Sequence, residues 1–237
     1  MSVPIQIKGL RKNFGKCTAL NGVDMMVNQG EVHAFLGPNG AGKTTTIRCM
    51  LGVLRASGGE IKLFGQNAWK DAVELHKRLA YVPGDVNLWD NLTGGEVIDL
   101  FLSFRGAKYE KARREHFLQR FELDPTKKCR TYSKGNRQKV ALVSALVSDV
   151  ELYVLDEPTS GLDPLLEKVF QDCVLELKQK GCSVLLSSHI MSEVEKLADR
   201  VSIIKEGKIV LNGSTMEISE KGKSLEDLFL SQYEGRK

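Results

Sequence analysis

The segment that most constrains the fold is a short glycine-rich sequence, GPNGAGKT, at residues 37–44. It fits the pattern Gly-x-x-x-x-Gly-Lys-[Ser/Thr] and lies between a compact apolar run at residues 31–36 and a helical pattern at about 43–51. Glycines let the backbone turn tightly and point successive N–H groups inward, where they and the helix N-terminus bind phosphate oxygens. A phosphate-binding loop between a strand and a helix is therefore predicted here.

Two side chains of this loop have separate chemical roles in a phosphate site. Lys43 is expected to reach the β- and γ-phosphates of a nucleoside triphosphate, and the Thr44 hydroxyl is expected to ligate Mg²⁺. A glycine-rich turn without any ligand is the alternative interpretation. The residues expected to contact the nucleotide are Gly37, Pro38, Asn39, Gly40, Ala41, Gly42, Lys43, Thr44 and Thr45.

The rest of the chain alternates short β patterns with helical patterns, which indicates a mostly parallel sheet covered on both faces. Strands are expected at residues 5–10, 23–27, 31–36, 60–64, 151–155 and 182–187, helices at about 43–51, 164–180, 191–198 and 224–232, and a hairpin at 201–205 and 208–211. From Trp69 to about Leu146 helical spacing dominates, as in Val73, Leu75 and Leu79. We expect a single domain over residues 1–237, with a core at about 1–83 and 151–237 and a helical lobe inserted at about 84–150.

A second motif places carboxylates at the end of a predicted strand. Four apolar residues at 152–155 precede Asp156 and Glu157. An aspartate in this place is expected to hold Mg²⁺, usually through water, and the following glutamate can orient and deprotonate the attacking water. The alternative is a strand that merely ends at an acidic turn. His189 follows another apolar run and would face the same crevice, where it could contact the γ-phosphate, although a lone histidine is usually structural.

The composition favours an ordinary globular protein of the reducing cytosol. Net charge is +4 and the basic residues are scattered; the densest basic run, at 108–114, alternates with glutamates as on an exposed helix, so no nucleic acid is expected as partner. The five cysteines form no CxxC pair, which argues against a disulfide framework or a metal site. No apolar stretch reaches the roughly 18 residues that a membrane span needs, and residues 1–10 lack a secretory signal.

The sequence YSKGNRQ at residues 132–138 resembles the signature motif of ABC ATPases, usually written LSGGQ. With the phosphate loop, the Asp-Glu pair and the histidine in this order, the resemblance covers nearly the whole chain. It implies an α/β P-loop NTPase core whose mostly parallel sheet is flanked by helices, an antiparallel β portion near the N-terminus, and an inserted helical lobe. It also implies ATP and Mg²⁺ as cofactors, with Thr44 and Asp156 holding the metal and Lys43, Glu157 and His189 acting in hydrolysis.

The resemblance assigns further nucleotide contacts outside the loop. Phe14 is similar to the aromatic residue that stacks on adenine. Ser133 and Gly135 would sit at a helix N-terminus and cover the ATP held by a second subunit, and Asp163 ends a segment, 160–163, that resembles the loop contacting that subunit. Two such domains would close head-to-tail around two nucleotides and reopen after hydrolysis.

The chain departs from the family pattern at two places. The signature carries Tyr132, Lys134 and Asn136 where the family has Leu, Gly and Gln. In the segment YVPGD at 81–85, Gly84 stands where the family usually has a glutamine that reaches the metal or the lytic water. Asp85 is the candidate substitute, and the sequence leaves open which of these two residues takes that function.

The resemblance implies an ATP-hydrolysing subunit, cytoplasmic and peripheral on the inner face of the cell membrane, that drives a separate transmembrane permease subunit. It would pair as a homodimer or as a heterodimer with a second ABC ATPase. Segments 91–96 and 224–230 resemble the exporter branch that moves drugs, polysaccharides or lipids, although a capped helix start and a packing helix would explain them equally. A soluble ABC-type ATPase of an assembly machinery is the alternative; a module that binds ATP without turnover is disfavoured by the intact catalytic residues.

Overall fold

The computed structural model describes residues 3–104, 111–220, 225, 227 and 229. A six-stranded sheet forms the centre of the core, in the order β10-β9-β3-β8-β7-β6. Its strands are β3 (Val32–Leu36), β6 (Leu79–Val82), β7 (Leu152–Asp156), β8 (Ser183–Ser188), β9 (Arg200–Lys205) and β10 (Lys208–Ser214). All neighbours pair in parallel except β10, which returns antiparallel from β9 through the turn expected at residues 206–207. The predicted mostly parallel sheet is confirmed.

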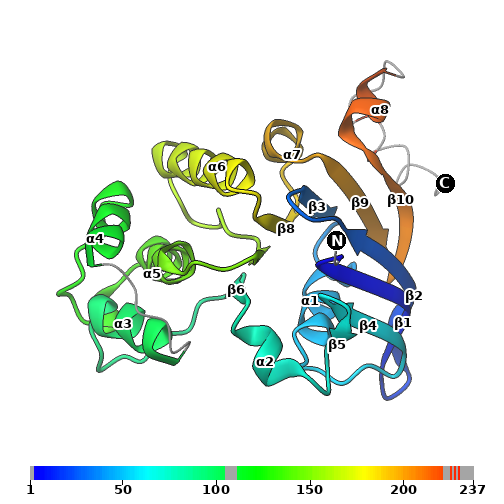
Figure 1. Cartoon of the computed structure of the whole chain (residues 1–237), viewed down its shortest axis with the longest axis horizontal. Coiled ribbons are helices and arrows are strands. Elements are labelled where there is room, and N and C mark those ends of the chain that lie inside the picture. Colours follow the sequence, from blue (N-terminus) through cyan, green and yellow to red (C-terminus); the bar gives the residue numbers. More distant parts are fainter. Residues whose placement is uncertain (1–2, 105–110, 221–224, 226, 228, 230–237) are drawn as a thin grey trace.

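A second, four-stranded antiparallel sheet covers one side of the first, as expected for the N-terminal part. It comprises β1 (Ile5–Phe14), β2 (Cys17–Val27), β4 (Gly58–Leu63) and β5 (Gln66–Asn67). Helix α1 (Lys43–Met50) lies between the two sheets, where Ile47 and Met50 share one apolar cluster with Leu10 of β1 and Leu185 of β8. This packing fixes the start of α1, and therefore the phosphate loop, against both sheets (Figure 1).

The three central strands read as continuous apolar runs because both of their faces are covered. Every residue of β3, β7 and β8 is buried. In the parallel register Leu36 pairs with Ser188, and Asp156 pairs with Ser187. The three strands therefore end at the same edge of the sheet. The phosphate loop, Glu157 and His189 leave the sheet side by side at this edge.

The helical lobe lies at the opposite side of the molecule from the antiparallel sheet (Figure 1). It contains α3 (Gly94–Phe104), α4 (Lys111–Arg120), the 3₁₀ turn η1 (Cys129–Thr131) and α5 (Lys134–Val147). Residues 140–147 of α5 are buried, and its Val143 belongs to the same apolar cluster as Phe121 of the lobe and Phe170 of α6 (Pro164–Gln179) in the core. Lobe and core thus share a continuous interior, and the boundaries 84–150 stay a prediction.

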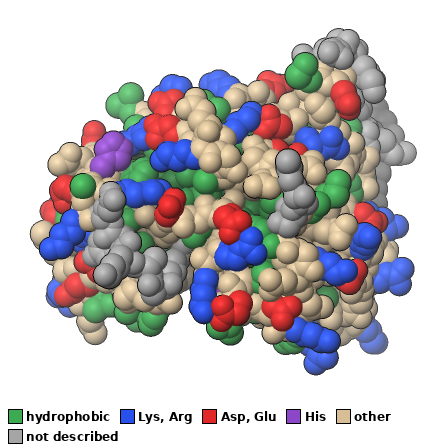
Figure 2. Space-filling view, viewed as in Figure 1, with side chains coloured by type: hydrophobic (Ala, Val, Ile, Leu, Met, Phe, Trp, Pro, Cys, Tyr) green, Lys and Arg blue, Asp and Glu red, His purple; other side chains and the backbone are tan. Residues whose placement is uncertain are grey.

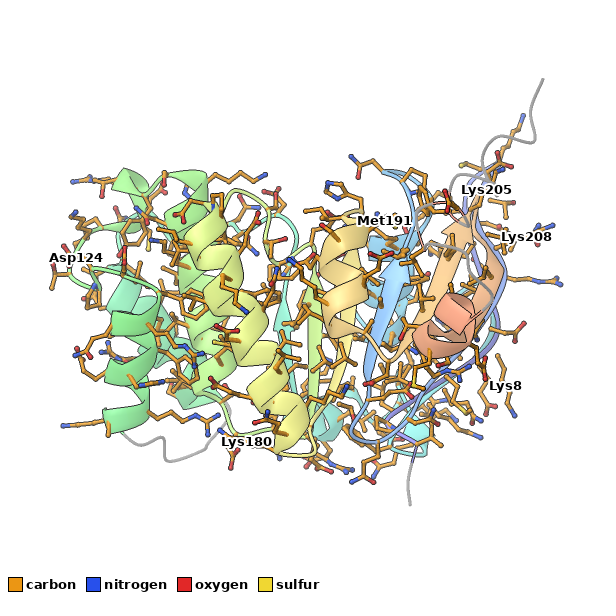
Figure 3. The ribbon with its side chains drawn as sticks, turned by 90° about the horizontal axis from the view of Figure 1, so that it is seen from above. Lys8, Asp124, Lys180, Met191, Lys205 and Lys208 are labelled. Carbon is orange, nitrogen blue, oxygen red and sulfur yellow. The ribbon has the colours of Figure 1, made fainter. Side chains whose placement is uncertain are left out.

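Shorter helices complete the architecture: α2 (Ala72–His76), α7 (Met191–Leu197) and α8 (Thr215–Glu220). Viewed from above, Asp124 at the end of the lobe and Lys208 of β10 lie at opposite ends of the molecule (Figure 3). No helix in the described ranges is both long and apolar enough to cross a membrane. All five cysteines are free thiols.

One element was predicted wrongly. Leu79 does not continue a helical pattern but begins β6, where it pairs with Leu152 of β7. The spacing misleads because α2 ends at His76, and Leu75 and Leu79 are buried in the same apolar cluster from a helix and from a strand. Helix α8 was not expected. The helix expected at 224–232 and part of the basic run at 108–114 lie largely outside the described residues.

Candidate nucleotide-binding site

A cavity of about 390 Å³ opens at the edge of the sheet where β3, β7 and β8 end. Its wall combines the phosphate loop with Asp156, Glu157 and His189, which the sequence placed far apart. The structure thus brings together the loop, the acidic strand end and the histidine around one space.

The phosphate loop is held in shape by close packing beneath it. Gly42 precedes α1 with φ 116°, and a Cβ there would lie 2.7 Å from a methyl carbon of Leu20, so only glycine fits. The first N–H groups of α1 have no intrahelical acceptors and carry the positive end of the helix dipole. Thr44 and Thr45 of this first turn line the cavity. The loop can therefore offer backbone donors to an anion.

Lys43 is buried, with 5% of its side chain exposed, and its ammonium group is fully engaged. It donates to the Gly37 carbonyl at 2.5 Å and lies 3.1 Å from a carboxylate oxygen of Glu157. A buried cation held this way keeps its direction toward the cavity, where phosphate oxygens can compete for it.

Asp156 is completely buried at the end of β7, and both of its oxygens accept hydrogen bonds. The Thr44 hydroxyl donates to Oδ2 at 2.8 Å, and the Ser187 hydroxyl of the neighbouring strand donates to Oδ1 at 2.5 Å. Hydroxyl and carboxylate oxygens are the ligands that Mg²⁺ prefers, and this ion is usually completed by phosphates and water. The Thr44 hydroxyl and the Asp156 carboxylate therefore fit an ion of this kind by the chemistry of their oxygens.

Glu157 occupies a strained backbone position with φ 50°. Its N–H donates at 3.1 Å to the Ser187 carbonyl and also lies 3.1 Å from the Ser187 hydroxyl. Its carboxylate is held between Lys43 and His189, whose Nδ1 lies 2.5 Å from Oε2. With Nδ1 protonated toward Glu157, Nε2 of the half-exposed imidazole can face a ligand. A carboxylate held in this way can orient a water molecule and accept its proton.

The sequence missed other groups of the site, chiefly Arg48 and Tyr81, which line the cavity, and Ser187, which donates a hydrogen bond to Asp156. Burial, and then the negative charge of Asp156, raise the pKa of Tyr81 to about 12, so its hydroxyl stays a donor. Arg48 lies on α1 one turn past Thr44 and lines the same space. Gly84 and Asp85 both line the cavity, so both stay candidates for the place of the family glutamine.

The remaining predicted contacts lie outside this cavity. Phe14 is 48% exposed near the tip of the β1–β2 hairpin, and the Lys12 ammonium lies 4.8 Å from its ring. Ser133 caps α5 by accepting from the Asn136 N–H at 3.3 Å, and Asp163 caps α6 by accepting from two N–H groups at 3.0 Å. Neither these residues nor Gly135 belong to the wall of the cavity in the described structure.

The altered signature motif contacts the loop that follows Glu157. The Lys134 ammonium donates to the Ser160 hydroxyl at 2.8 Å, and the buried Gln138 amide donates to the Pro158 carbonyl at 2.9 Å. Gly135 packs so closely that an added Cβ would lie 2.5 Å from the Gly161 carbonyl oxygen. The signature end of α5 is therefore attached to the same loop as the cavity.

A family model described as "ABC transporter" matches residues 20–160, which is more than half of the chain. This chain belongs to the ABC transporter family. It is an ATP-binding subunit of that family and an ATPase. A second model, "AAA domain, putative AbiEii toxin, Type IV TA system", matches the shorter stretch 128–195.

Relatives and solved structures agree with this assignment. The daunorubicin resistance ATP-binding protein DrrA3 of Streptomyces coeruleorubidus is 36% identical, over 96% of this chain and 74% of that protein. The bacitracin transport ATP-binding protein BcrA of Bacillus licheniformis is 35% identical, over 89% of this chain and 69% of its own length. The solved structure of an ATP binding subunit of an ABC transporter matches with a TM-score of 0.87 at 30% identity, covering 96% of this chain and 98% of that one.

The chain spans a smaller share of other ABC transporter ATP-binding proteins. It covers 62% of a relative from Nostoc and 58% of one from Synechocystis.

Proposed function

We propose that this ATPase closes head-to-tail with a second ATPase subunit around two MgATP molecules and so drives export through a separate transmembrane subunit. The observation that carries the proposal is the arrangement of Lys43, Glu157 and His189 around one cavity, while Ser133 and Gly135 lie outside it. This separation supports a site shared between two subunits, with the signature end of each chain covering the nucleotide of the other.

Hydrolysis requires water to attack the γ-phosphorus while the bond to the β-phosphate oxygen breaks. Lys43 balances charge on the phosphate oxygens, and Glu157, held by Lys43 and His189, orients the water and takes its proton. Mg²⁺, held by Thr44 and Asp156, would supply further charge neutralisation when bound. Nε2 of His189 can contact the γ-phosphate and so distinguish ATP from ADP.

Dimer formation is testable because it depends on the γ-phosphate. Glu157→Gln keeps the shape of the side chain but removes the base, so we expect ATP binding to persist and an ATP-bound dimer to accumulate. Gel filtration with MgATP measures this; Glu217→Gln, an exposed change on α8, is the matched control and should behave as wild type. Elution of the Glu157→Gln protein as a monomer with every nucleotide would count against closure.

The membrane partner needs a place to dock, and the structure offers an apolar groove of about 350 Å³ between α2 and α3. Val73 and Phe104 line it with 77% and 73% of their surfaces exposed. Elsewhere, on the face shown in Figure 2, acidic and basic side chains are interspersed. We assign the groove to an apolar cytoplasmic segment of the transmembrane subunit, because burying these side chains there would stabilise the complex.

Tyr81 connects this groove with the nucleotide cavity, since it lines both. Val73→Glu or Phe104→Glu should abolish co-purification with a co-expressed transmembrane subunit while ATP binding is retained. Met216→Glu is the control, because Met216 is 71% exposed on α8, away from the groove. Equal recovery of the partner by all three variants would contradict the assignment.

Export and a peripheral position on the inner membrane face rest on the relatives named for daunorubicin resistance and bacitracin transport. Affinity purification of this chain from detergent-solubilised membranes should recover an integral membrane protein. Recovery of only water-soluble partners would favour an assembly machinery instead.

A further inference from the structure

The hydrolytic site leaves one buried acid without a role. Glu193, the third residue of α7, is only 4% exposed. The Ser188 hydroxyl donates to its Oε2 at 2.8 Å, whereas its Oε1 has no hydrogen-bond partner of normal geometry among the described residues. Helix α7, whose first residue Met191 is labelled in Figure 3, packs against α6 and β8, so this carboxyl group lies inside the core.

The surroundings of Glu193 favour its protonated form. Burial raises its pKa, while the hydroxyls of Ser188 and Thr159 act in the opposite direction. The carboxylates of Glu167 on α6 and Glu157 after β7 raise it further. No lysine, arginine or histidine pairs with this carboxyl among the described residues. A neutral acid also needs less solvation than a buried carboxylate would.

The position of Glu193 connects it with both catalytic strand ends. Three successive residues at the end of β8 reach three different acids: Ser187 binds Asp156, Ser188 binds Glu193, and His189 binds Glu157. The Ser188 hydroxyl also accepts from the Ile190 N–H at 3.0 Å, so the peptide on each side of His189 is fixed.

The second contact lies on the loop that follows the catalytic glutamate. Thr159 is buried and stands two residues after Glu157, close enough to act on the Glu193 carboxyl. One carboxyl group therefore has a neighbouring hydroxyl on each side of the pair: Ser188, just before His189, and Thr159, two residues after Glu157.

We propose that Glu193 is a positioning residue, a buried carboxyl group whose contacts with Ser188 and the Thr159 loop hold His189 against Glu157 during ATP hydrolysis. This inference rests on the roles proposed for Glu157 and His189. It adds a group that touches neither nucleotide nor metal and acts only through the residues that do.

Two variants of similar volume separate positioning from packing. Glu193→Gln keeps a donor and an acceptor at the carboxyl position, whereas Glu193→Met fills the space without hydrogen bonds. Glu193→Met leaves the buried Ser188 hydroxyl without its acceptor, at a cost of about 1–3 kcal/mol of stability, whereas Glu193→Gln keeps that acceptor. Thermal unfolding and ATP-binding affinity are measured first, and kcat and KM for ATP follow.

We expect Glu193→Gln to retain kcat within about threefold of wild type, and Glu193→Met to lose kcat by about 10- to 100-fold at nearly unchanged KM, as for a misplaced catalytic group. Ser188→Ala should lower kcat in the same way. The double variant Ser188→Ala/Glu193→Met should be no worse than the poorer single variant, because both changes break one contact.

Wild-type kcat for Glu193→Met, or equal losses for Gln and Met, would overturn the inference, and so would multiplicative losses in the double variant. His189→Ala is measured in the same series, so that a failure of the proposed role of His189 can be distinguished from a failure of the inference about Glu193. If His189→Ala leaves kcat unchanged, the proposed role of His189 fails. If it lowers kcat while Glu193→Met does not, only the inference about Glu193 fails.

Discussion

The nucleotide cavity and the signature end of α5 present their polar groups in opposite ways. In the cavity the proposed catalytic side chains contact one another: Lys43 and His189 both reach Glu157. At the signature end, Ser133 is exposed and uses its hydroxyl to cap its own helix. Under the proposed head-to-tail closure, the signature end would act on the nucleotide of a second subunit and not on the cavity of its own chain. Changes at the two places should therefore have separable effects.

The largest effect is expected inside the cavity. Lys43→Ala removes the buried ammonium that we expect to bind the phosphates and takes the Lys43 cation away from Glu157, so turnover should fall by at least about a thousandfold. Steady-state phosphate release measures this. Lys62→Ala, on the exposed surface of β4, is the control and should hydrolyse ATP normally. Undiminished turnover by Lys43→Ala would refute the central role of the cavity.

A substitution at the signature end should lower the rate of ATP hydrolysis without changing the affinity of the monomer for ATP. Gly135→Ala would place a methyl group 2.5 Å from the Gly161 carbonyl oxygen and push the adjoining loop away. We expect hydrolysis to fall about 100-fold, as for a displaced positioning element, with ATP binding to the cavity unchanged. Binding titration and turnover measured together test this separation.

Gly213→Ala is the matched control for that change. Its added Cβ would meet Ile218 at an ordinary 3.7 Å, so neither hydrolysis nor binding should change. If Gly135→Ala weakened ATP binding to the isolated monomer, the signature end would not be separate from the cavity, and the comparison would fail.

A smaller effect is expected at Phe14, which belongs to neither region. Its exposed ring is available for stacking on adenine, and loss of one base–aromatic stack costs about 1–3 kcal/mol. Phe14→Ala should therefore raise KM for ATP about tenfold, with kcat retained, and Phe14→Tyr should restore KM. Equal affinity of all three proteins for ATP would remove Phe14 from the site.

The site residues that form contiguous motifs could be predicted from the sequence. Those that meet only because two strands lie side by side in the sheet could not. The loop at 37–44 and the Asp156–Glu157 pair were readable because each motif is a short run at a strand end. Ser187, by contrast, acts on Asp156 only because β8 lies beside β7 in the sheet. Glu193 could not be predicted either, because its burial depends on how α7 packs against α6 and β8. Leu79 was misjudged because spacing alone does not distinguish a helix followed by a strand from one longer helix.

The smallest effect should come from restoring the family glutamine. Gly84 has an ordinary backbone conformation, and an added Cβ would lie 3.2 Å from the Asp156 carbonyl and 3.5 Å from the Glu157 Cβ. Because Asp85 lines the same cavity, we expect Gly84→Gln to change turnover by only about twofold, the scale of a change of about 0.5 kcal/mol.

Asp85 decides how that small effect is interpreted. If Asp85 replaces the missing glutamine, Asp85→Ala should lower turnover, and adding Gly84→Gln to that variant should recover it, because the amide would then be the only side chain of the pair that reaches the metal or the water. Turnover of the four proteins at saturating MgATP measures the recovery. If Asp85→Ala leaves turnover unchanged, hydrolysis needs neither the Asp85 carboxylate nor a glutamine amide at position 84. Contact with the metal or the attacking water would then be assigned to the other polar residues of the cavity, Tyr81 and Arg48. A loss that Gly84→Gln does not recover would mean that Asp85 acts in a place the amide does not reach.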